Sequence, residues 1–71
     1  MEWVYQEASR WYIKGRTANA DVYRPADDSC FIVVASPDEY ILYDWSGENV
    51  LGTFPTLAAA QVYAAITTER N

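Results

Sequence analysis

The chain of 71 residues lacks histidine and has a single cysteine, Cys30. Without histidine, the Ser–His and Cys–His dyads of nucleophilic catalysis cannot form, and the commonest ligand for transition metals is missing. A single cysteine cannot make an internal disulfide, which fits a reducing compartment such as the cytoplasm. Cys30 begins an apolar stretch with no base near it in sequence, so we expect a small core residue rather than a nucleophile.

Long apolar runs are also missing. The longest, CFIVVA at residues 30–35, is far too short to span a bilayer. The first ten residues, MEWVYQEASR, have neither the basic start nor the apolar core of a signal peptide. We therefore expect a cytoplasmic protein that does not associate with a membrane.

Basic residues are absent from residues 25–69, although this stretch is rich in acids. The net charge of the chain is −5, and most of its basic side chains lie in the first 24 residues. The acids of the second stretch are Asp27, Asp28, Asp38, Glu39, Asp44, Glu48 and Glu69. Such a block of charge repels phosphate backbones and attracts basic surfaces. Two interpretations stay open: a merely solvated acidic surface, or a surface that binds a basic partner.

The acidic residues form no recognisable catalytic or metal-binding motif. Both acid pairs, 27–28 and 38–39, lie in predicted turns, where Asp is common for conformational reasons. Asp44 and Glu48 could offer oxygens to calcium, but the spaced ligands of an EF-hand loop are missing. No glycine-rich phosphate loop is present either. We therefore expect a protein that is not an enzyme and that holds no cofactor and no metal.

Short β-branched and aromatic runs, each followed by a turn signal, predict an antiparallel meander. The predicted strands are 20–24, 30–36, 40–45 and 50–54. The sequence thus predicts a single α+β domain over residues 1–71, in which a small antiparallel sheet of three to four strands has a C-terminal helix packed on one face.

The pattern changes from strand to helix after Phe54. Pro55 ends the sheet because it has no N–H, Thr56 is a good N-cap, and the alanines that follow favour a helix. Apolar residues at i, i+4, i+7 and i+8 are expected to face the sheet, namely Ala58, Val62, Ala65 and Ile66.

The first 16 residues allow two structures. A helix over residues 2–14 would bring Val4, Ala8, Trp11 and Tyr12 together. A hairpin would suit the many β-prone side chains, but its turn would have to lie at EASR, residues 7–10, which contains no turn residue. We take the helix as the first expectation and the hairpin as the alternative.

The strands at 30–36 and 40–45 are apolar on both alternating faces. In the first of them, Cys30, Ile32 and Val34 alternate with Phe31, Val33 and Ala35. A sheet with one face in water would alternate apolar and polar residues, so both faces of these strands need cover. The C-terminal helix covers one. The other requires the N-terminal segment, a second copy of the chain, or a different protein.

Residues 51–65 read LGTFPTLAAAQVYAA. They resemble the last strand and helix of the ethylene-response-factor type DNA-binding domain, in which one helix follows a three-stranded antiparallel sheet. The residues that fit are Leu51, Gly52, Thr53, Phe54, Thr56, Ala60 and Tyr63. The resemblance implies that Gly52 permits close packing, Phe54 anchors the strand to the helix and Thr56 caps the helix. The DNA-binding arginines of that family have no counterpart on the strands of residues 30–54, which contain no Arg or Lys; only Arg24, on the strand before, could serve.

In size and composition the chain also resembles small phage-encoded inhibitors such as anti-CRISPR proteins, which are often acidic and rich in aromatics. Tyr and Trp anchor many protein interfaces, and most aromatics here lie among acids. We therefore expect a non-catalytic acidic domain that inhibits or adapts a basic, nucleic-acid-handling protein complex. The expected partner-binding residues are Asp27, Asp28, Asp38, Glu39, Tyr40, Tyr43, Asp44, Trp45 and Glu48.

Two alternatives remain. The chain could be a small nucleic-acid-binding module that uses the basic side chains of its first third, Arg10, Lys14, Arg16 and Arg24. It could also be a homodimeric structural subunit, since the two-faced apolar strands need cover from somewhere.

Overall fold

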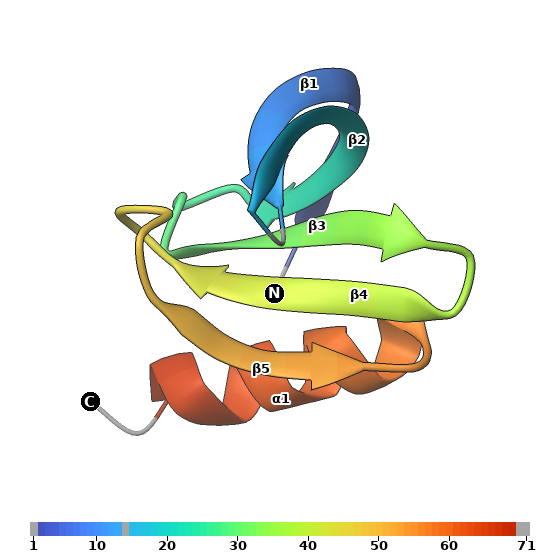
Figure 1. Cartoon of the computed structure of the whole chain (residues 1–71). Helices are drawn as coiled ribbons and strands as arrows, with labels where there is room; N and C mark the ends of the chain where they lie inside the picture. The colour runs from blue at the N-terminus through green and yellow to red at the C-terminus, as the bar shows by residue number, and fades with distance from the viewer. Residues whose placement is uncertain (1, 14, 70–71) are drawn as a thin grey trace.

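The structure is a computed structural model that describes residues 2–13 and 15–69 (Figure 1). Its elements are β1 (Trp3–Ile13), β2 (Arg16–Pro25), β3 (Cys30–Ser36), β4 (Glu39–Asp44), β5 (Val50–Phe54) and α1 (Leu57–Glu69). Each strand pairs antiparallel with the next, so the sheet order is β1-β2-β3-β4-β5. The α+β class with a C-terminal helix is confirmed. The sheet has more strands than the three or four expected.

The N-terminal segment is a strand, so the helix expected over residues 2–14 is wrong. β1 pairs with β2 along its length, and Ile13 pairs with Arg16 at the closed end of the hairpin. Gly15 lies in this turn with a φ of +84°, which glycine adopts without strain. The hairpin alternative is wrong as well, because its expected turn at residues 7–10 lies inside β1; the hairpin that forms joins β1 to β2 instead. The segment's many aromatic and β-branched side chains suit a strand, and the uncovered face of the sheet gives them a surface to pack on.

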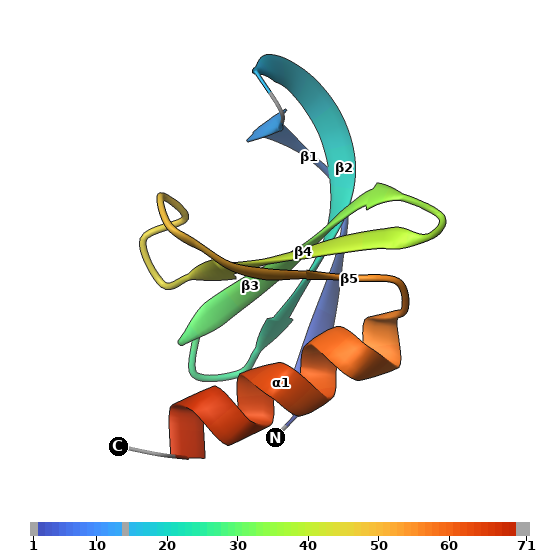
Figure 2. The same ribbon diagram turned by 60° about the horizontal axis from the view of Figure 1, so that its bottom comes forward.

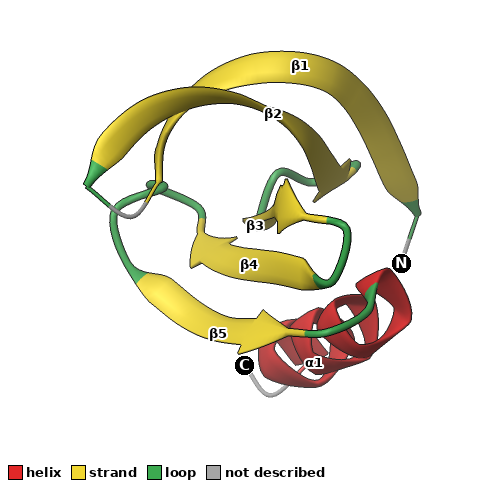
Figure 3. Ribbon diagram, turned by 45° about the vertical axis from the view of Figure 1, so that its right-hand side comes forward, coloured by secondary structure: helices red, strands yellow, loops and turns green. Residues whose placement is uncertain are grey.

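β2 joins the rest of the sheet over only a short length. Its ladder partners on β3 are Val33, opposite Val22, and Ile32, opposite Tyr23. The first half of β2 leaves the plane of the sheet, and the β1–β2 hairpin curls over β3 and β4 (Figure 3). Helix α1 lies on the opposite side of the sheet (Figure 2). The central strands therefore lie between the hairpin and the helix.

Both faces of β3 and β4 are buried, as their apolar composition predicts. The hairpin-side core contains Ala20, Val22, Val33, Ile41 and Tyr43, with Trp11, Phe31 and Ala35 packed against it. The helix-side core contains Cys30, Ile32, Leu42, Ala60 and Ala64. The hairpin and the helix of the same chain thus cover both faces of β3 and β4. Neither a second copy nor a different protein is needed to bury them.

Helix α1 packs on the sheet through a different face from the one expected. Ala60 and Ala64 are buried, and Leu57 packs against the same core. Val62 and Ile66, which we expected to face the sheet, are more than half exposed. Apolar residues occur on all sides of α1, so their spacing alone does not show which side packs on the sheet. The small side chains of Ala60 and Ala64 let the helix approach the sheet closely, which the larger pair would prevent.

At the junction between β5 and α1, Thr56, Phe54 and Gly52 have the capping and packing roles that their chemistry favours. The Thr56 hydroxyl accepts a hydrogen bond from the Ala59 N–H at 3.1 Å, which caps the helix. The Phe54 ring lies over Gly52, where an added Cβ would come within 2.9 Å of it. The same ring packs against Tyr63 at a centroid distance of 5.3 Å, joining strand to helix.

Candidate functional site: an acidic pocket at one end of the sheet

A pocket of about 580 Å³ lies where three parts of the chain meet at one end of the sheet. These parts are the β2–β3 turn, the β4–β5 turn with the start of β5, and the C-terminal half of α1. Its acidic lining residues are Asp27, Asp28 and Asp44; the others are Ser29, Cys30, Trp45, Leu51, Ala64 and Thr67. This volume falls in the range of sites that bind small molecules or single side chains.

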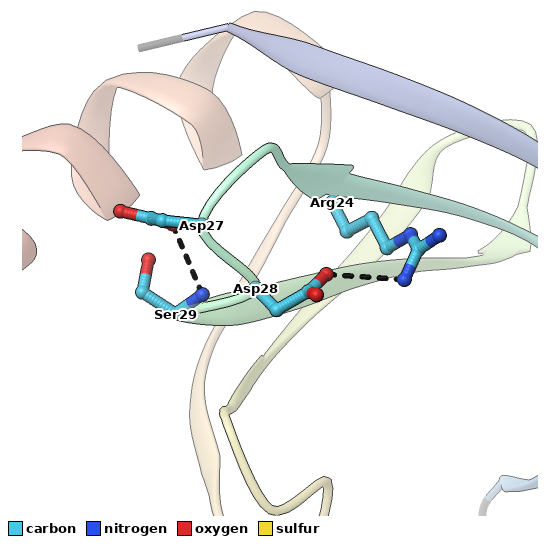
Figure 4. A network of polar contacts seen from close by, with 4 residues as sticks. All are labelled: Arg24, Asp27, Asp28 and Ser29. Atoms are coloured by element: carbon cyan, nitrogen blue, oxygen red, sulfur yellow. Dashed lines mark hydrogen bonds and ion pairs between the residues drawn. The ribbon is translucent and has the colours of Figure 1, made fainter.

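The β2–β3 turn fixes two carboxylates in different directions (Figure 4). Asp28 has a φ of +55°, a conformation that Asp tolerates better than most residues, and its carboxylate pairs with Arg24 at 3.1 Å. Asp27 points instead toward the helix. Its carboxylate accepts a hydrogen bond from the Ser29 N–H at 3.1 Å.

Ser29 also sets the charge state of this turn. Its hydroxyl and its backbone N–H hold the pKa of Asp27 below the ordinary value. The N–H makes a full hydrogen bond, whereas the buried hydroxyl has no partner of good geometry among the described residues. The Ser29 N–H therefore does most to hold the carboxylate in its ionised form. Asp27 is therefore ionised at neutral pH.

The β4–β5 turn is organised around Asp44. One oxygen of its carboxylate accepts bonds from the N–H groups of Ser46 and Gly47, both at 3.1 Å, and from the Ser46 hydroxyl at 2.6 Å. The other oxygen accepts a bond from Asn49 Nδ2 at 2.6 Å. These donors, the Ser46 hydroxyl first and Asn49 next, lower the pKa of Asp44 to about 2. Asp44 thus builds the turn and gives the pocket a permanent negative charge.

Trp45 lies on the rim of the pocket with 74% of its side chain exposed. This exposure leaves the indole ring free to contact a bound molecule. Behind it, Leu51 and Ala64 provide an apolar wall. Carboxylates, an aromatic face and an apolar wall therefore surround one cavity.

The structure separates the acids that the sequence placed together. Asp38 and Glu39 lie at the β3–β4 turn, at the other end of the sheet from the pocket. Seven residues of β3 separate the two ends, about 20 Å at ~3.3 Å per residue. Asp38 accepts a hydrogen bond from the Ser36 hydroxyl at 2.8 Å. Glu48 is exposed in the β4–β5 turn, beyond the residues that line the pocket.

Of two expected partner-binding aromatics, Tyr43 lies in the protein interior and Tyr40 is half-buried. Tyr43 is only 7% exposed and stacks on Trp11 in the hairpin-side core, at a centroid distance of 5.6 Å. Tyr40 packs against the helix-side core. The burial of Tyr43 leaves no room for it as an interface anchor, whereas part of the Tyr40 side chain remains at the surface.

Two basic residues of the nucleic-acid-binding alternative, Arg16 and Arg24, lie far apart on β2. Arg24 is paired with Asp28, and Arg16 lies at the other end of β2. Eight residues separate them, about 26 Å along the strand at ~3.3 Å per residue. Arg10 is exposed on β1, and Lys14 lies outside the described residues. This alternative stays a prediction without support from a shared surface.

The sequence pointed to four of the pocket's residues, Asp27, Asp28, Asp44 and Trp45, and missed the wall that completes it. Leu51 reaches the pocket because it is the extra residue of β5 where the β4–β5 register shifts, between the pairs 42–52 and 43–50. Ala64 and Thr67 reach it through a helix face that apolar spacing did not select. No local signal in the sequence predicts the extra residue in β5 or the face by which α1 packs on the sheet.

The described residues contain no group of three or more Cys, Asp or Glu side chains placed to hold a metal ion. Within the same part of the chain, no helix combines the length and apolar character needed to cross a membrane. Comparison of the chain with protein-family models, with curated proteins and with solved structures finds no match.

Proposed function

We propose that this domain is a non-catalytic binding module whose acidic pocket receives a Lys or Arg side chain of a basic protein partner. The observation that supports this is the meeting of Asp27, Trp45 and Leu51 around one cavity of about 580 Å³. Lys and Arg have an apolar stem and a cationic head. The stem fits the wall at Leu51, while the head fits between a carboxylate and an indole face.

The expected strength of one such contact is modest. A charge-assisted hydrogen bond contributes about 1.5–3 kcal/mol, and a cation–π contact at an exposed site about 0.5–1 kcal/mol. One captured side chain therefore contributes about 2–4 kcal/mol in all, which corresponds to millimolar affinity at best. Useful affinity requires further basic residues of the partner, attracted by the field of a chain with net charge −5.

The partner class that fits this field is a basic nucleic-acid-handling protein, which the domain would inhibit or adapt by occupying a phosphate-binding groove. Residues 25–69 contain no Lys or Arg, so this half of the chain presents no charge that repels such a groove. The lowered pKa values of Asp27 and Asp44 keep both carboxylates ionised at every physiological pH.

Capture from nuclease-treated lysate of the organism that encodes the chain tests this partner class. We expect the immobilised domain to retain a basic nucleic-acid-binding protein that added DNA or RNA displaces. Trp45→Ala should lose this protein while keeping its fold, because the Trp45 side chain is largely in water. A partner retained equally by wild type and Trp45→Ala, or unaffected by nucleic acid, would contradict the proposal.

A further inference from the structure

Exposed apolar side chains gather on β5 and α1. Eight large hydrophobic residues are exposed among the described side chains, and five of them lie on these two elements. They are Val50, Leu51, Val62, Tyr63 and Ile66. Single exposed hydrophobics are common, but a group on adjoining elements marks an interaction surface.

The outer side of α1 contributes a regular stripe to this surface. Ala58, Val62 and Ile66 follow one another at intervals of four residues, so they lie along one side of the helix. All three are exposed, with Val62 at 60% and Ile66 at 53%. We call these three residues the α1 stripe. The stripe points away from the sheet, because the buried Ala60 and Ala64 hold the opposite side of the helix against it.

Charge limits which molecule can cover the α1 stripe. The chain has ten acidic and five basic residues, and none of them lies in residues 49–68. A partner recognised by its basic charge would find no counter-charge on this segment. A second copy of the chain, by contrast, repels the first over most of its surface because both have a net charge of −5. The uncharged segment is where two copies can approach.

The α1 stripe also complements itself under two-fold symmetry. When two α1 helices pack antiparallel about Val62, each Val62 meets its equivalent, and Ala58 of one copy meets Ile66 of the other. A small residue thus faces a large one on each side of a central valine pair, and the contact is the same for both copies. β5 adjoins this surface and is a terminal strand of the sheet, with no charged residue in Val50–Phe54.

We propose that the α1 stripe is a homodimer interface, in which two α1 helices pack antiparallel across a two-fold axis. A standard interface buries about 800 Å² per partner, roughly a sixth of the 4678 Å² surface of this chain. One helix face with the adjoining strand is smaller, so we expect a weak dimer with a Kd on the order of 100 µM. The α1 stripe itself lies outside the acidic pocket, since Ala64 and Thr67 line the pocket from the sheet-facing side of α1.

Analytical ultracentrifugation of the whole chain between about 20 µM and 1 mM tests this proposal. We expect a monomer–dimer equilibrium that strengthens several-fold when salt screens the repulsion between two negative chains. Val62→Lys should weaken dimerisation at least tenfold. It should not unfold the domain, because residue 62 is exposed and Lys favours helix more than Val does. Asn19 is an exposed residue of β2, so Asn19→Lys makes the same change of charge away from the α1 stripe. This control should leave the monomer–dimer equilibrium unaltered.

Disulfide trapping gives a second measurement that works for weak dimers. Val62→Cys should oxidise to a covalent dimer much faster than Asn19→Cys, because only residue 62 meets its equivalent across the two-fold axis. Cys30 is 1% exposed and does not compete. A monomer at 1 mM, or equal trapping at positions 62 and 19, would overturn the proposal and assign the stripe to a different protein. A dimer that Val62→Lys leaves intact would overturn it as well. None of these outcomes bears on the acidic pocket.

Discussion

Replacing Trp11 by alanine tests the packing of the hairpin over the sheet. The Trp11 ring packs against Phe31 and Tyr43, with centroid distances of 5.8 and 5.6 Å. It also reaches the β4–β5 turn, where an added Cβ on Gly47 would lie 3.5 Å from it. Trp11 is thus a side chain of β1 that links the hairpin to both central strands and to the turn beside the pocket.

The cost of Trp11→Ala follows from the area that the ring covers. A buried tryptophan removes about 150–250 Å² from water, and at about 25 cal/mol per Å² this is worth about 4–6 kcal/mol. Because Trp11 is only partly buried, we expect the free energy of unfolding to fall by about 3 kcal/mol. A domain of this length has a total of about 4–10 kcal/mol. The variant should therefore lose a large share of its stability.

Urea unfolding followed by far-UV circular dichroism measures this loss. With an m-value of about 1 kcal/mol/M, the midpoint of Trp11→Ala should fall by about 3 M. Trp45→Ala removes the same side chain from an exposed position and should shift the midpoint by less than about 0.5 M. Equal shifts for the two variants would refute the packing of the hairpin described above.

Four further predictions concern single residues. The Cys30 thiol, 1% exposed and with a pKa raised by burial, should react with a thiol reagent only when the domain unfolds; fast labelling of the native protein would contradict its place in the core. Gly47→Ala should lower the free energy of unfolding by about 1 kcal/mol, because the φ of residue 47 is +75°. A thermal melt measures this loss, and an unchanged melt would argue against the turn. Ala60→Leu should cost about 1–3 kcal/mol by overpacking a fully buried site, and no loss would mean that α1 does not lie close to the sheet. The Asp44 carboxyl should titrate near pH 2 by NMR, so its stabilising contribution is complete above about pH 3.8 and disappears as pH falls through about 2; a midpoint near 4 would show that its hydrogen bonds do not form.

The strand and turn pattern after residue 20 was predictable because local chemistry determines it. Pro55 and Thr56 placed the start of α1, and the two-faced composition of 30–36 correctly required cover on both sides. The N-terminal hairpin was missed because its bulge disturbs the alternation of β1 and its turn has only Gly15 as a signal.

The pocket was only half predictable, for a physical reason. Asp27 and Asp44 are turn residues, and the meander brings their turns to the same end of the sheet. The other half depends on the face by which α1 packs. That face is decided by the small volumes of Ala60 and Ala64 against the sheet, which the apolar periodicity of this helix does not reveal.

The binding of a hexa-arginine peptide tests the central claim, that the acidic pocket and not the overall negative charge receives a basic partner. NMR shifts of the Trp45 indole N–H and of Leu51 report on the pocket. Two double variants remove equal charge from opposite ends of the sheet: Asp27→Asn with Asp28→Asn, and Asp38→Asn with Glu39→Gln. We predict that the first weakens peptide binding at least tenfold and the second less than threefold. Equal losses would contradict the claim, because they would show that the peptide responds to net charge alone.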